Sequence, residues 1–426
     1  MNKSILGTAA IYTVGSIISQ IFTFITQVVL MKNTSLHAYG FFGISMEVLI
    51  LLQMVVGNAF RNFYLQKLRV GDRDVNSLTQ YQIINGSLYI SLFSCILYFS
   101  YGVDLYISLS LTISFLLTSV ILPLQAKLLV ENKRITLIIK DIITSVLLLM
   151  TVFITVVLLK LSIKFVVVIQ LIPSLIVSFA YLFIYQKDFF CSGRLKNIFS
   201  ENFKLEKALL VFMGVFLVNS LHNKLGVFYI KNFSELSFLA LYLATFKFIN
   251  PTLFIQSSLI SAYMPKFIND LNFKFDVKVF LTFFVCGITI SIGLFLLYPY
   301  VISILGLDSY KDSYPIMKIG CWYITIVFIY GVLSNYISVT GGQNYVLMTN
   351  CIALFLYAVS VFLLGHYVSS WQLVLLVTYL FVLAEGVISI FYFFYIRKKG
   401  LKITPFFLIA PLVIILLNTF ICFHEY

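Results

Sequence analysis

Apolar stretches of about 20 residues recur along the whole chain and are separated by short polar segments. A helix of that length crosses the roughly 30 Å of hydrocarbon in a bilayer, because each residue advances it by about 1.5 Å. The pattern predicts twelve membrane-spanning helices, at 5–31, 36–60, 78–102, 105–126, 141–159, 164–186, 208–231, 236–260, 279–300, 316–340, 346–366 and 372–396. A further apolar stretch at 406–423 is long enough for a thirteenth.

The composition supports an all-α integral membrane protein. Hydrophobic residues make up 61% of the chain and charged residues 11%, whereas about a quarter of the residues of soluble domains are charged. The first predicted helix has no small-residue cleavage site after a short apolar core, so we expect it to be retained rather than removed as a signal peptide. The six cysteines are scattered singly, without the spacing of a metal site or a disulfide framework, and no metal is expected.

Lysine and arginine are distributed unevenly among the predicted loops. With the N-terminus in the cytoplasm, 21 of the 29 basic residues fall in inner loops and 6 in outer loops. Cytoplasmic loops of membrane proteins carry this excess, so we expect a multi-pass protein of the bacterial inner membrane with a cytoplasmic N-terminus. The net charge of +13 is then explained by inner anchors and implies no nucleic-acid partner.

An internal repeat divides the twelve helices into two groups of six. Shifting the chain by 203 residues without gaps aligns Tyr39 with Tyr242 and Gln53 with Gln256. An even number of helices separates the copies, so the two lobes would be related by a pseudo-two-fold axis along the membrane normal. The predicted organisation is an N-terminal lobe at 1–186, a cytoplasmic loop at 187–207, a C-terminal lobe at 208–396, and a basic loop with the thirteenth stretch at 397–426.

Polar residues form one face on the first helix of each predicted lobe. The 203-residue shift pairs Ser16, Ser19, Gln20 and Thr23 with Asn219, His222, Asn223 and Gly226. Small polar residues also hold membrane helices together, which is the alternative explanation for each of them taken alone. Because a whole stripe is polar, we favour the lining of a central cavity between the lobes.

Ionisable groups at membrane depth are the strongest functional candidates, since each costs at least about 2.5–3.5 kcal/mol at a helix centre. Glu47 and Lys247 lie near the middle of repeat-equivalent helices. In one interpretation Lys247, with Asn250 on its stripe and Arg61 near the inner mouth, meets an anionic substrate while Glu47 carries a proton. In the other, Glu47 and Lys247 form a structural ion pair.

Three further candidates lie in the C-terminal half. Glu385 either couples transport to an ion or bonds to a hydroxyl in a helix contact. His222 either senses a proton gradient or is a neutral histidine bonded to a neighbouring helix. Lys224 lies off the polar face of its helix, so either that helix bends or unwinds near Gly226, or Lys224 pairs with an acid such as Glu385.

Two prolines inside predicted spans should interrupt their helices. Pro173 and the Asn250–Pro251 pair each remove a backbone hydrogen bond, so the sixth and eighth helices are expected to bend. The sequence has no phosphate-binding loop, no HExxH and no GxSxG motif. We therefore predict a non-enzyme with no catalytic residues and no cofactor, driven by an H⁺ or Na⁺ gradient rather than by ATP.

Three segments resemble polysaccharide flippases of the O-antigen transporter (Wzx-like) type, in the multidrug/oligosaccharidyl-lipid/polysaccharide exporter superfamily. They are "SLHAYGFFGISME" at 35–47, "INPTLFIQSSLISAYMPKF" at 249–267 and "ISVTGGQN" at 337–344. The resemblance implies a two-lobed bundle that carries an undecaprenyl-diphosphate-linked oligosaccharide from the cytoplasmic to the outer leaflet by alternating access, for lipopolysaccharide or other polysaccharide export. It also implies function as a monomer, alongside a glycan polymerase and a chain-length regulator.

Two other functions stay open at this point. A cation-coupled multidrug antiporter of the same superfamily would favour a cavity rich in acids and aromatic groups. A membrane-embedded glycan polymerase or glycosyltransferase would need a substantial outer loop, whereas the stretch at 301–315 offers only Asp308, Lys311 and Asp312.

Overall fold

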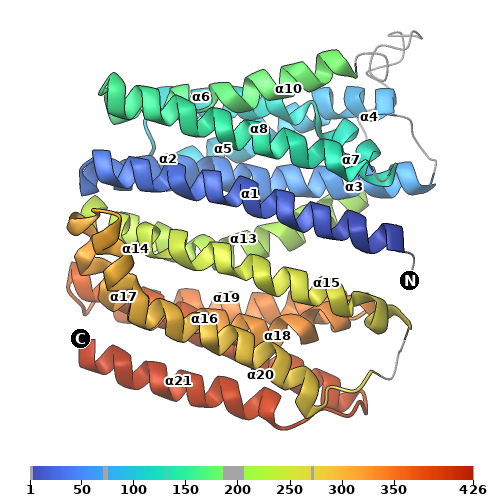
Figure 1. The fold of residues 1–426 in the computed structure, drawn as a ribbon, viewed down its shortest axis with the longest axis vertical. Helices are drawn as coiled ribbons and strands as arrows, with labels where there is room; N and C mark the ends of the chain where they lie inside the picture. Colours follow the sequence, from blue (N-terminus) through green and yellow to red (C-terminus); the bar gives the residue numbers. More distant parts are fainter. Residues whose placement is uncertain (1–2, 71–74, 132, 186–205, 270–272, 426) are drawn as a thin grey trace. The chain divides into compact units, whose positions relative to one another are not determined.

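The computed structural model describes residues 3–70, 75–131, 133–185, 206–269 and 273–425 (Figure 1). These residues form helices joined by short turns, and the only strand-like pairing among them is an isolated parallel bridge between Phe275 and Ile403. Thirteen helical stretches are long and apolar enough to cross a membrane. They include the twelve predicted spans and a helix over the stretch at 406–423, which confirms the predicted all-α fold class.

The helices of the first half are, in chain order, α1 Lys3–Asn33, α2 Leu36–Leu52, α3 Asn58–Val70, α4 Val75–Tyr81, α5 Ser87–Tyr101, α6 Leu105–Ser119, α7 Leu122–Val130, α8 Arg134–Val152, α9 Ile163–Ile169 and α10 Ile172–Ile184. Three wide π-helical turns continue α2, α4 and α8, namely η1 Gln53–Gly57, η2 Gln82–Gly86 and η3 Phe153–Leu158.

The second half contains α13 Lys207–Phe233, α14 Leu236–Ile249, η5 Asn250–Thr252, α15 Leu253–Asn269, α16 Val277–Ile304, η6 Asp308–Ser313, α17 Tyr314–Gly320, α18 Trp322–Val339, α19 Gln343–Gly365, α20 Ser370–Lys398 and α21 Phe406–Glu425. Polar side chains cap several of these helices. Asp276 accepts the backbone N–H of Val279 at the start of α16, and Ser369 with Gln372 forms a capping box at the start of α20.

Both predicted proline interruptions are present. Between α14 and α15 the chain makes a 3₁₀ turn that contains Pro251, and Pro173 is the second residue of α10, which begins at Ile172 after α9 has ended at Ile169. A proline lacks the N–H that would continue the α-helical ladder, so the helix ends or changes pitch there. The π-helical turns contain no proline and were not predicted from the sequence.

The chain divides into two compact units, Met1–Ser220 and Leu221–Tyr426, and the division falls inside α13. The predicted loop at 187–207 lies outside the described residues except at its last two positions. Helix ends relate the two halves at an offset of 200 residues rather than 203, since α2 begins at Leu36 and α14 at Leu236. At this offset Glu47 of α2 corresponds to Lys247 of α14, so equivalent helical positions carry opposite charges.

In the first unit, α1 packs along α8, and α2 with its continuation α3 is the most buried span. Residues of α4, α7 and α10 form an apolar cluster made of Val75, Ile121, Leu124, Leu128, Val177 and Tyr181. At one end, the Nζ of Lys164 lies 2.9 Å from a carboxylate oxygen of Asp104, which caps α6. This hydrogen bond lowers the pKa of Asp104, and the pair joins the start of α6 to the start of α9.

In the second unit, α18 and α20 are buried along most of their lengths and form the centre. Small residues bring α16 against α18. A Cβ at Gly287 would lie 3.0 Å from Thr325, and the Oγ of Ser291 lies 2.7 Å from the Oγ1 of Thr325. Because lipid tails are as apolar as leucine, such close packing and interhelical hydrogen bonds, rather than burial from water, hold membrane helices together.

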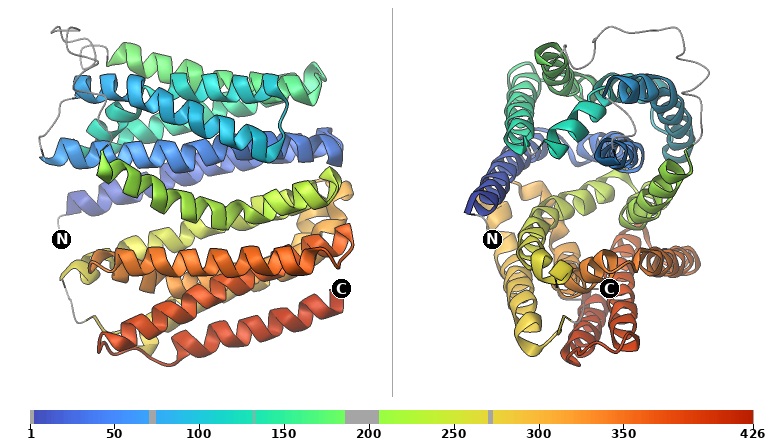
Figure 2. Two further views of the ribbon diagram at one scale, coloured as in Figure 1. Left: turned by 180° about the vertical axis from the view of Figure 1, so that it is seen from behind. Right: turned by 90° about the vertical axis from the view of Figure 1, so that its right-hand side faces the viewer.

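Helix α21 crosses the second unit from end to end. Near its start, the ring of Phe407 lies 5.3 Å from that of Phe280, at the start of α16. Near its end, Glu425 accepts a 2.6 Å hydrogen bond from Lys318 of α17, which follows the far end of α16. Figure 2 shows α21 running back along α20. Its 20 residues extend about 30 Å, enough to span a bilayer.

We predict that the two ends of α21 lie on opposite sides of the membrane, with its start in the cytoplasm. In a variant whose six cysteines are replaced by serine, Lys398→Cys should react with an impermeant maleimide only after spheroplasts are lysed. His424→Cys should react in intact spheroplasts, as should the outer-loop control Lys311→Cys. Reaction of Lys398→Cys and His424→Cys from the same side would contradict a crossing.

Candidate functional site

Three polar side chains meet in the buried interior of the second unit. The Nε2 of His222, on α13, lies 3.2 Å from the Oε1 of Glu385, on α20. The hydroxyl of Tyr330, on α18, donates a 2.6 Å hydrogen bond to the Oε2 of the same carboxylate. His222 is 4% exposed and Glu385 is 2% exposed. The structure thus brings together two candidates that the sequence analysis treated separately, and adds a tyrosine that it missed.

The hydrogen bonds restrict where protons can lie. An ionised carboxylate only accepts, so with Glu385 ionised the Nε2 of His222 carries a hydrogen, and in neutral histidine the Nδ1 is then the bare acceptor. That Nδ1 is buried and has no hydrogen-bond partner within the described part of the chain. A proton added there gives His222 a positive charge and turns the contact with Glu385 into an ion pair.

Aromatic rings surround the cluster. The ring of His222 lies 5.6 Å from that of Phe381 and 6.0 Å from that of Tyr357. Phe381 in turn contacts Tyr323 at 4.9 Å. The rings bury the histidine, and the hydrogen bonds from His222 and Tyr330 compensate the carboxylate for its own burial.

A second polar contact extends from the cluster toward α19. The rings of Tyr330 and Tyr392 lie 5.8 Å apart, and the hydroxyl of Tyr392 donates to the Oδ1 of Asn350 at 3.2 Å. A continuous row of contacts therefore runs through the second unit, from His222 on α13 to Asn350 on α19.

Gly226 allows α13 to approach its neighbours one turn beyond His222. A Cβ at this position would lie 2.8 Å from the hydroxyl of Tyr242, 2.9 Å from that of Tyr357 and 2.8 Å from Val377. These contacts come from α14, α19 and α20. Any side chain here would push α13 away and with it the histidine.

Lys224 follows His222 by two residues on α13. Helix α13 is unbroken from Lys207 to Phe233, so of the bend or unwinding expected near Gly226 the unwinding is absent. The acid named as a partner in the other alternative, Glu385, bonds instead to His222 and Tyr330. Lys224 is half-buried.

The polar face of α1 serves helix packing in part. The Oγ of Ser19 lies 2.6 Å from that of Ser145 on α8, and Gln27 accepts a hydrogen bond from Tyr39 on α2. Thr23 donates to the carbonyl of Ser19 within its own helix. Ser16 is half-buried, and Gln20 and Thr23 are exposed, so this part of the stripe is not used in contacts with α2 or α8.

The remaining predicted residues are distributed over both units. Glu47, on α2, is 3% exposed, and Arg61, on α3, is half-buried. On α13, Asn219 is half-buried and Asn223 exposed. Lys247 is half-buried in the last turn of α14, and Asn250 is exposed in the 3₁₀ turn that follows. Among the residues that the structure describes, no three of His, Cys, Asp and Glu gather as a metal site would require.

The first unit also contains a buried polar network that the sequence analysis missed. Tyr64 of α3 donates a 2.6 Å hydrogen bond to the side-chain carbonyl of Gln82, and the amide of Gln82 donates to Ser119 at 3.0 Å. Gln82 lies in the π-helical turn η2, which the sequence did not predict. The sequence signal for this network was the presence of a glutamine in an apolar helix.

No protein-family model and no curated protein sequence matches the chain. Among solved structures, the lipid II flippase MurJ in an inward closed conformation matches with a TM-score of 0.70 over 96% of this chain and 97% of that one, at 14% identity.

Multidrug transporters match as well. A multidrug resistance MATE family transporter of the MOP superfamily, in an inward-facing conformation, gives a TM-score of 0.63 at 12% identity, over 89% of this chain and 94% of that one. The Vibrio cholerae MATE transporter VcmN gives 0.60 at 13% identity, over 93% and 97%. The chain has the fold of the MATE and MurJ transporters. At these identities the likeness establishes the fold alone.

We predict that the close packing of α13 at Gly226 stabilises the second unit. Gly226→Ala should destabilise the protein by about 1–3 kcal/mol, because three side chains would have to move. Gly214→Ala is a matched control on the same helix, since a Cβ there meets nothing within 4 Å, and it should leave stability unchanged or slightly raised. Thermal unfolding of the purified protein in detergent measures both, and equal melting temperatures for the two variants would contradict the assignment.

Proposed function

We propose that this protein is a flippase that moves an undecaprenyl-diphosphate-linked oligosaccharide, an O-antigen or related repeat unit, from the cytoplasmic to the outer leaflet of the bacterial inner membrane. The observation that carries the proposal is the match to a lipid II flippase over 96% of the chain, with a TM-score of 0.70. The short segments that resemble O-antigen flippases support the choice of substrate class. A glycan polymerase and a chain-length regulator would then act on the exported product, and one copy of the chain would suffice for transport.

Each unit supplies a basic side chain suited to a diphosphate. Arg61 is half-buried, and its Nε is buried without a hydrogen-bond partner in the described structure. Lys247 is half-buried next to a break in its helix. We assign both to the diphosphate, because charge-assisted hydrogen bonds to an anion compensate for holding a cation at membrane depth.

Polar side chains on α1, on α13 and in the turn after α14 suit sugar hydroxyls. Amide and hydroxyl groups both donate and accept, as sugar hydroxyls require of a partner. The residues assigned to this role are Ser16, Gln20, Asn219, Asn223 and Asn250. Of these, Gln20, Asn223 and Asn250 are exposed and therefore accessible to a ligand.

The cluster of His222, Glu385 and Tyr330 is our candidate for coupling to an ion gradient. Its contacts favour a proton over Na⁺, because imidazole nitrogen is a poor ligand for a hard cation and the carboxylate already accepts two hydrogen bonds. The proton would bind His222 or Glu385 and change the charge of a buried contact between α13 and α20. Glu47, also buried, is a second coupling candidate in the other unit.

A cation-coupled multidrug antiporter is the second candidate. The matches to MATE transporters favour it, as do the acid and the aromatic rings of the Glu385 cluster, which suit an organic cation. Arg61 and Lys247 argue against it, since they would repel a cationic drug. A polymerase or glycosyltransferase is not proposed, since Asp308, one of the two acids in the predicted outer loop, pairs with Lys311 at 2.8 Å.

Removal of either basic group should reduce glycan export. In a strain that lacks the chromosomal copy of this gene, Lys247→Ala and Arg61→Ala should each lower surface glycan at least about tenfold, given about 1.5–3 kcal/mol for a hydrogen bond to a charged group. Lys311→Ala, which removes an exposed lysine, is the control and should export normally. Wild-type export by both variants would show the diphosphate assignment to be wrong.

Replacing Glu385 by its amide should separate packing from coupling. Glu385→Gln keeps an oxygen that accepts from Tyr330 but cannot bind a proton. In proteoliposomes with an imposed pH gradient, we expect transport by this variant to lose its acceleration by the gradient while the protein still folds. Glu131→Gln, at an exposed carboxylate after α7, is the control and should respond as the wild type does. A full response by Glu385→Gln would remove the cluster from the coupling mechanism.

A further inference from the structure

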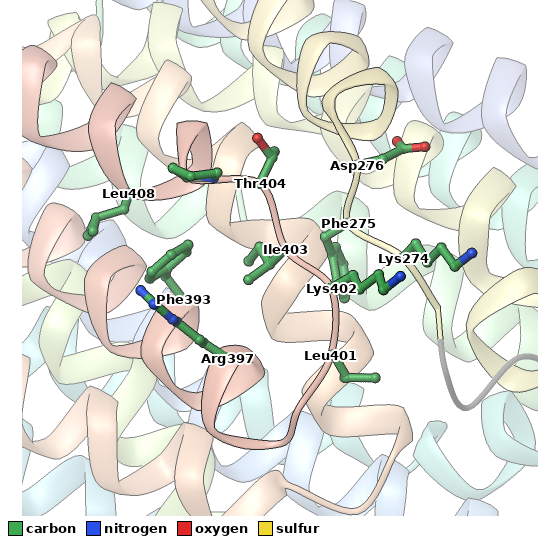
Figure 3. Close-up of a pocket in the computed structure, with 11 residues that line it drawn as sticks. Lys274, Phe275, Asp276, Phe393, Arg397, Leu401, Lys402, Ile403, Thr404 and Leu408 are labelled. Atoms are coloured by element: carbon green, nitrogen blue, oxygen red, sulfur yellow. The ribbon is translucent and has the colours of Figure 1, made fainter.

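A pocket of about 550 Å³ lies at one end of the second unit, away from the cluster of His222, Glu385 and Tyr330 (Figure 3). It is formed by the segment before α16, the last turns of α20, the connection between α20 and α21, and the first turn of α21. Its lining combines three basic side chains, Lys274, Arg397 and Lys402, with apolar ones such as Phe393 and Leu408.

Two extended segments form the floor of the pocket, and backbone hydrogen bonds fix them to each other. The N–H of Phe275 donates to the carbonyl of Lys402, and the N–H of Thr404 donates to the carbonyl of Phe275, both at 2.9 Å. The side chain of Phe275 is fully buried, with its ring 5.2 Å from that of Tyr336. Side chains alternate along an extended chain, so Lys274 and Asp276 turn away from the buried ring.

The three basic groups of the pocket form no ion pair within the described part of the chain. Lys274, Lys402 and Arg397 are exposed. In Figure 3 the side chains of Lys274 and Lys402 extend from the two segments in the same direction. The one acid of the lining, Asp276, accepts the N–H of Val279 as the cap of α16.

The first turn of α21 adds to the positive potential. The dipole of a helix places partial positive charge at its N-terminus, and Thr404, Pro405 and Leu408 of this region line the pocket. The net result is a concave site with three full positive charges, one engaged acid and a helix N-terminus beside it.

The position of the pocket at the ends of two predicted membrane spans indicates which class of anionic ligand fits it. It lies where two membrane-spanning helices end, α20 at Lys398 and α21 at Phe406. Phe393, Leu401 and Leu408 give it an apolar wall, and Phe406 beside it is 47% exposed. A ligand that fits has an anionic phosphate head and apolar chains that remain among the lipids.

We infer that this pocket binds the phosphate head group of an anionic phospholipid in the leaflet where α20 ends. In the predicted orientation this is the cytoplasmic leaflet. Basic residues that only anchor a loop need no concavity, and Lys398 and Lys399 next to the pocket are residues of that kind. The bound head group joins the segment before α16 to the turn between α20 and α21, and so stabilises the docking of α21.

Lipid binding to the purified full-length protein tests the inference. Native mass spectrometry in detergent, with phosphatidylglycerol or phosphatidylcholine added at equal concentration, gives the fraction of protein that carries each lipid. Each basic group near the surface contributes about fivefold to affinity for an anionic lipid, so Lys274→Gln/Lys402→Gln should bind phosphatidylglycerol about 25-fold more weakly. The control Lys398→Gln/Lys399→Gln removes the same charge from neighbouring positions outside the pocket and should bind as the wild type does.

Three outcomes would overturn the inference: equal binding of both lipids by the wild type, an equal loss in the control, or an unchanged affinity in the pocket variant. Inorganic phosphate and glycerol 3-phosphate distinguish a lipid from a soluble ligand. Neither should displace the lipid at millimolar concentration, and displacement would indicate a soluble phosphate site instead. Melting temperatures of both variants without lipid identify a folding defect, and Arg397→Gln, predicted to weaken binding about fivefold, gives a second test at an exposed position.

Discussion

The second unit is organised by the need to compensate a carboxylate buried among apolar helices. Glu385 lies within one of the most buried spans, and two donors, from His222 and Tyr330, meet its two oxygens. For those donors to reach it, α13 and α18 must both lie close to α20. Gly226 provides the room for α13, and the rings around Phe381 fill the space that remains. Removing either donor would leave a buried charge undercompensated, so packing and polar contacts depend on each other here.

The same contact gives the unit a way to respond to a proton. His222 has a buried nitrogen with no hydrogen-bond partner among the described residues, and protonation there would change the charge of a contact between α13 and α20. Helices in lipid are held together by close packing and interhelical hydrogen bonds. A change of charge at such a contact would therefore favour one packing arrangement of α13 and α20 over another. In the proposed mechanism, this change would link the cluster to transport.

The sequence predicted the helices well because lipid leaves the backbone few alternatives. Every N–H and C=O inside the bilayer must be paired, so long apolar stretches become helices, and the helix at 406–423 follows from the same rule. Proline also acts locally, which is why the interruptions at Pro173 and Pro251 were predictable. The π-helical turns contain no proline, and no comparable local signal marks them in the sequence.

The candidate site was predictable only as a set of unusual residues. His222 and Glu385 were conspicuous because ionisable groups are rare in spans, but their pairing depends on how α13 packs on α20. Tyr330 is one of 27 tyrosines, and nothing in the local sequence distinguishes it. Ser19 and Gln20 are adjacent in one stripe, yet the first bonds to α8 and the second is exposed. The offset between the two repeated halves was also predicted inexactly. A few residue identities favoured 203 residues, whereas the helix ends agree at 200.

Transport by the reconstituted protein distinguishes a flippase from a drug antiporter. The purified wild-type protein would be placed in liposomes whose inner leaflet contains a fluorescent undecaprenyl-diphosphate-linked oligosaccharide, with an impermeant quencher outside. The account predicts that the labelled lipid reaches the outer leaflet faster than in protein-free liposomes, that a pH gradient accelerates it, and that the drug cation ethidium is not moved. Transport of ethidium without movement of the labelled lipid would contradict the account.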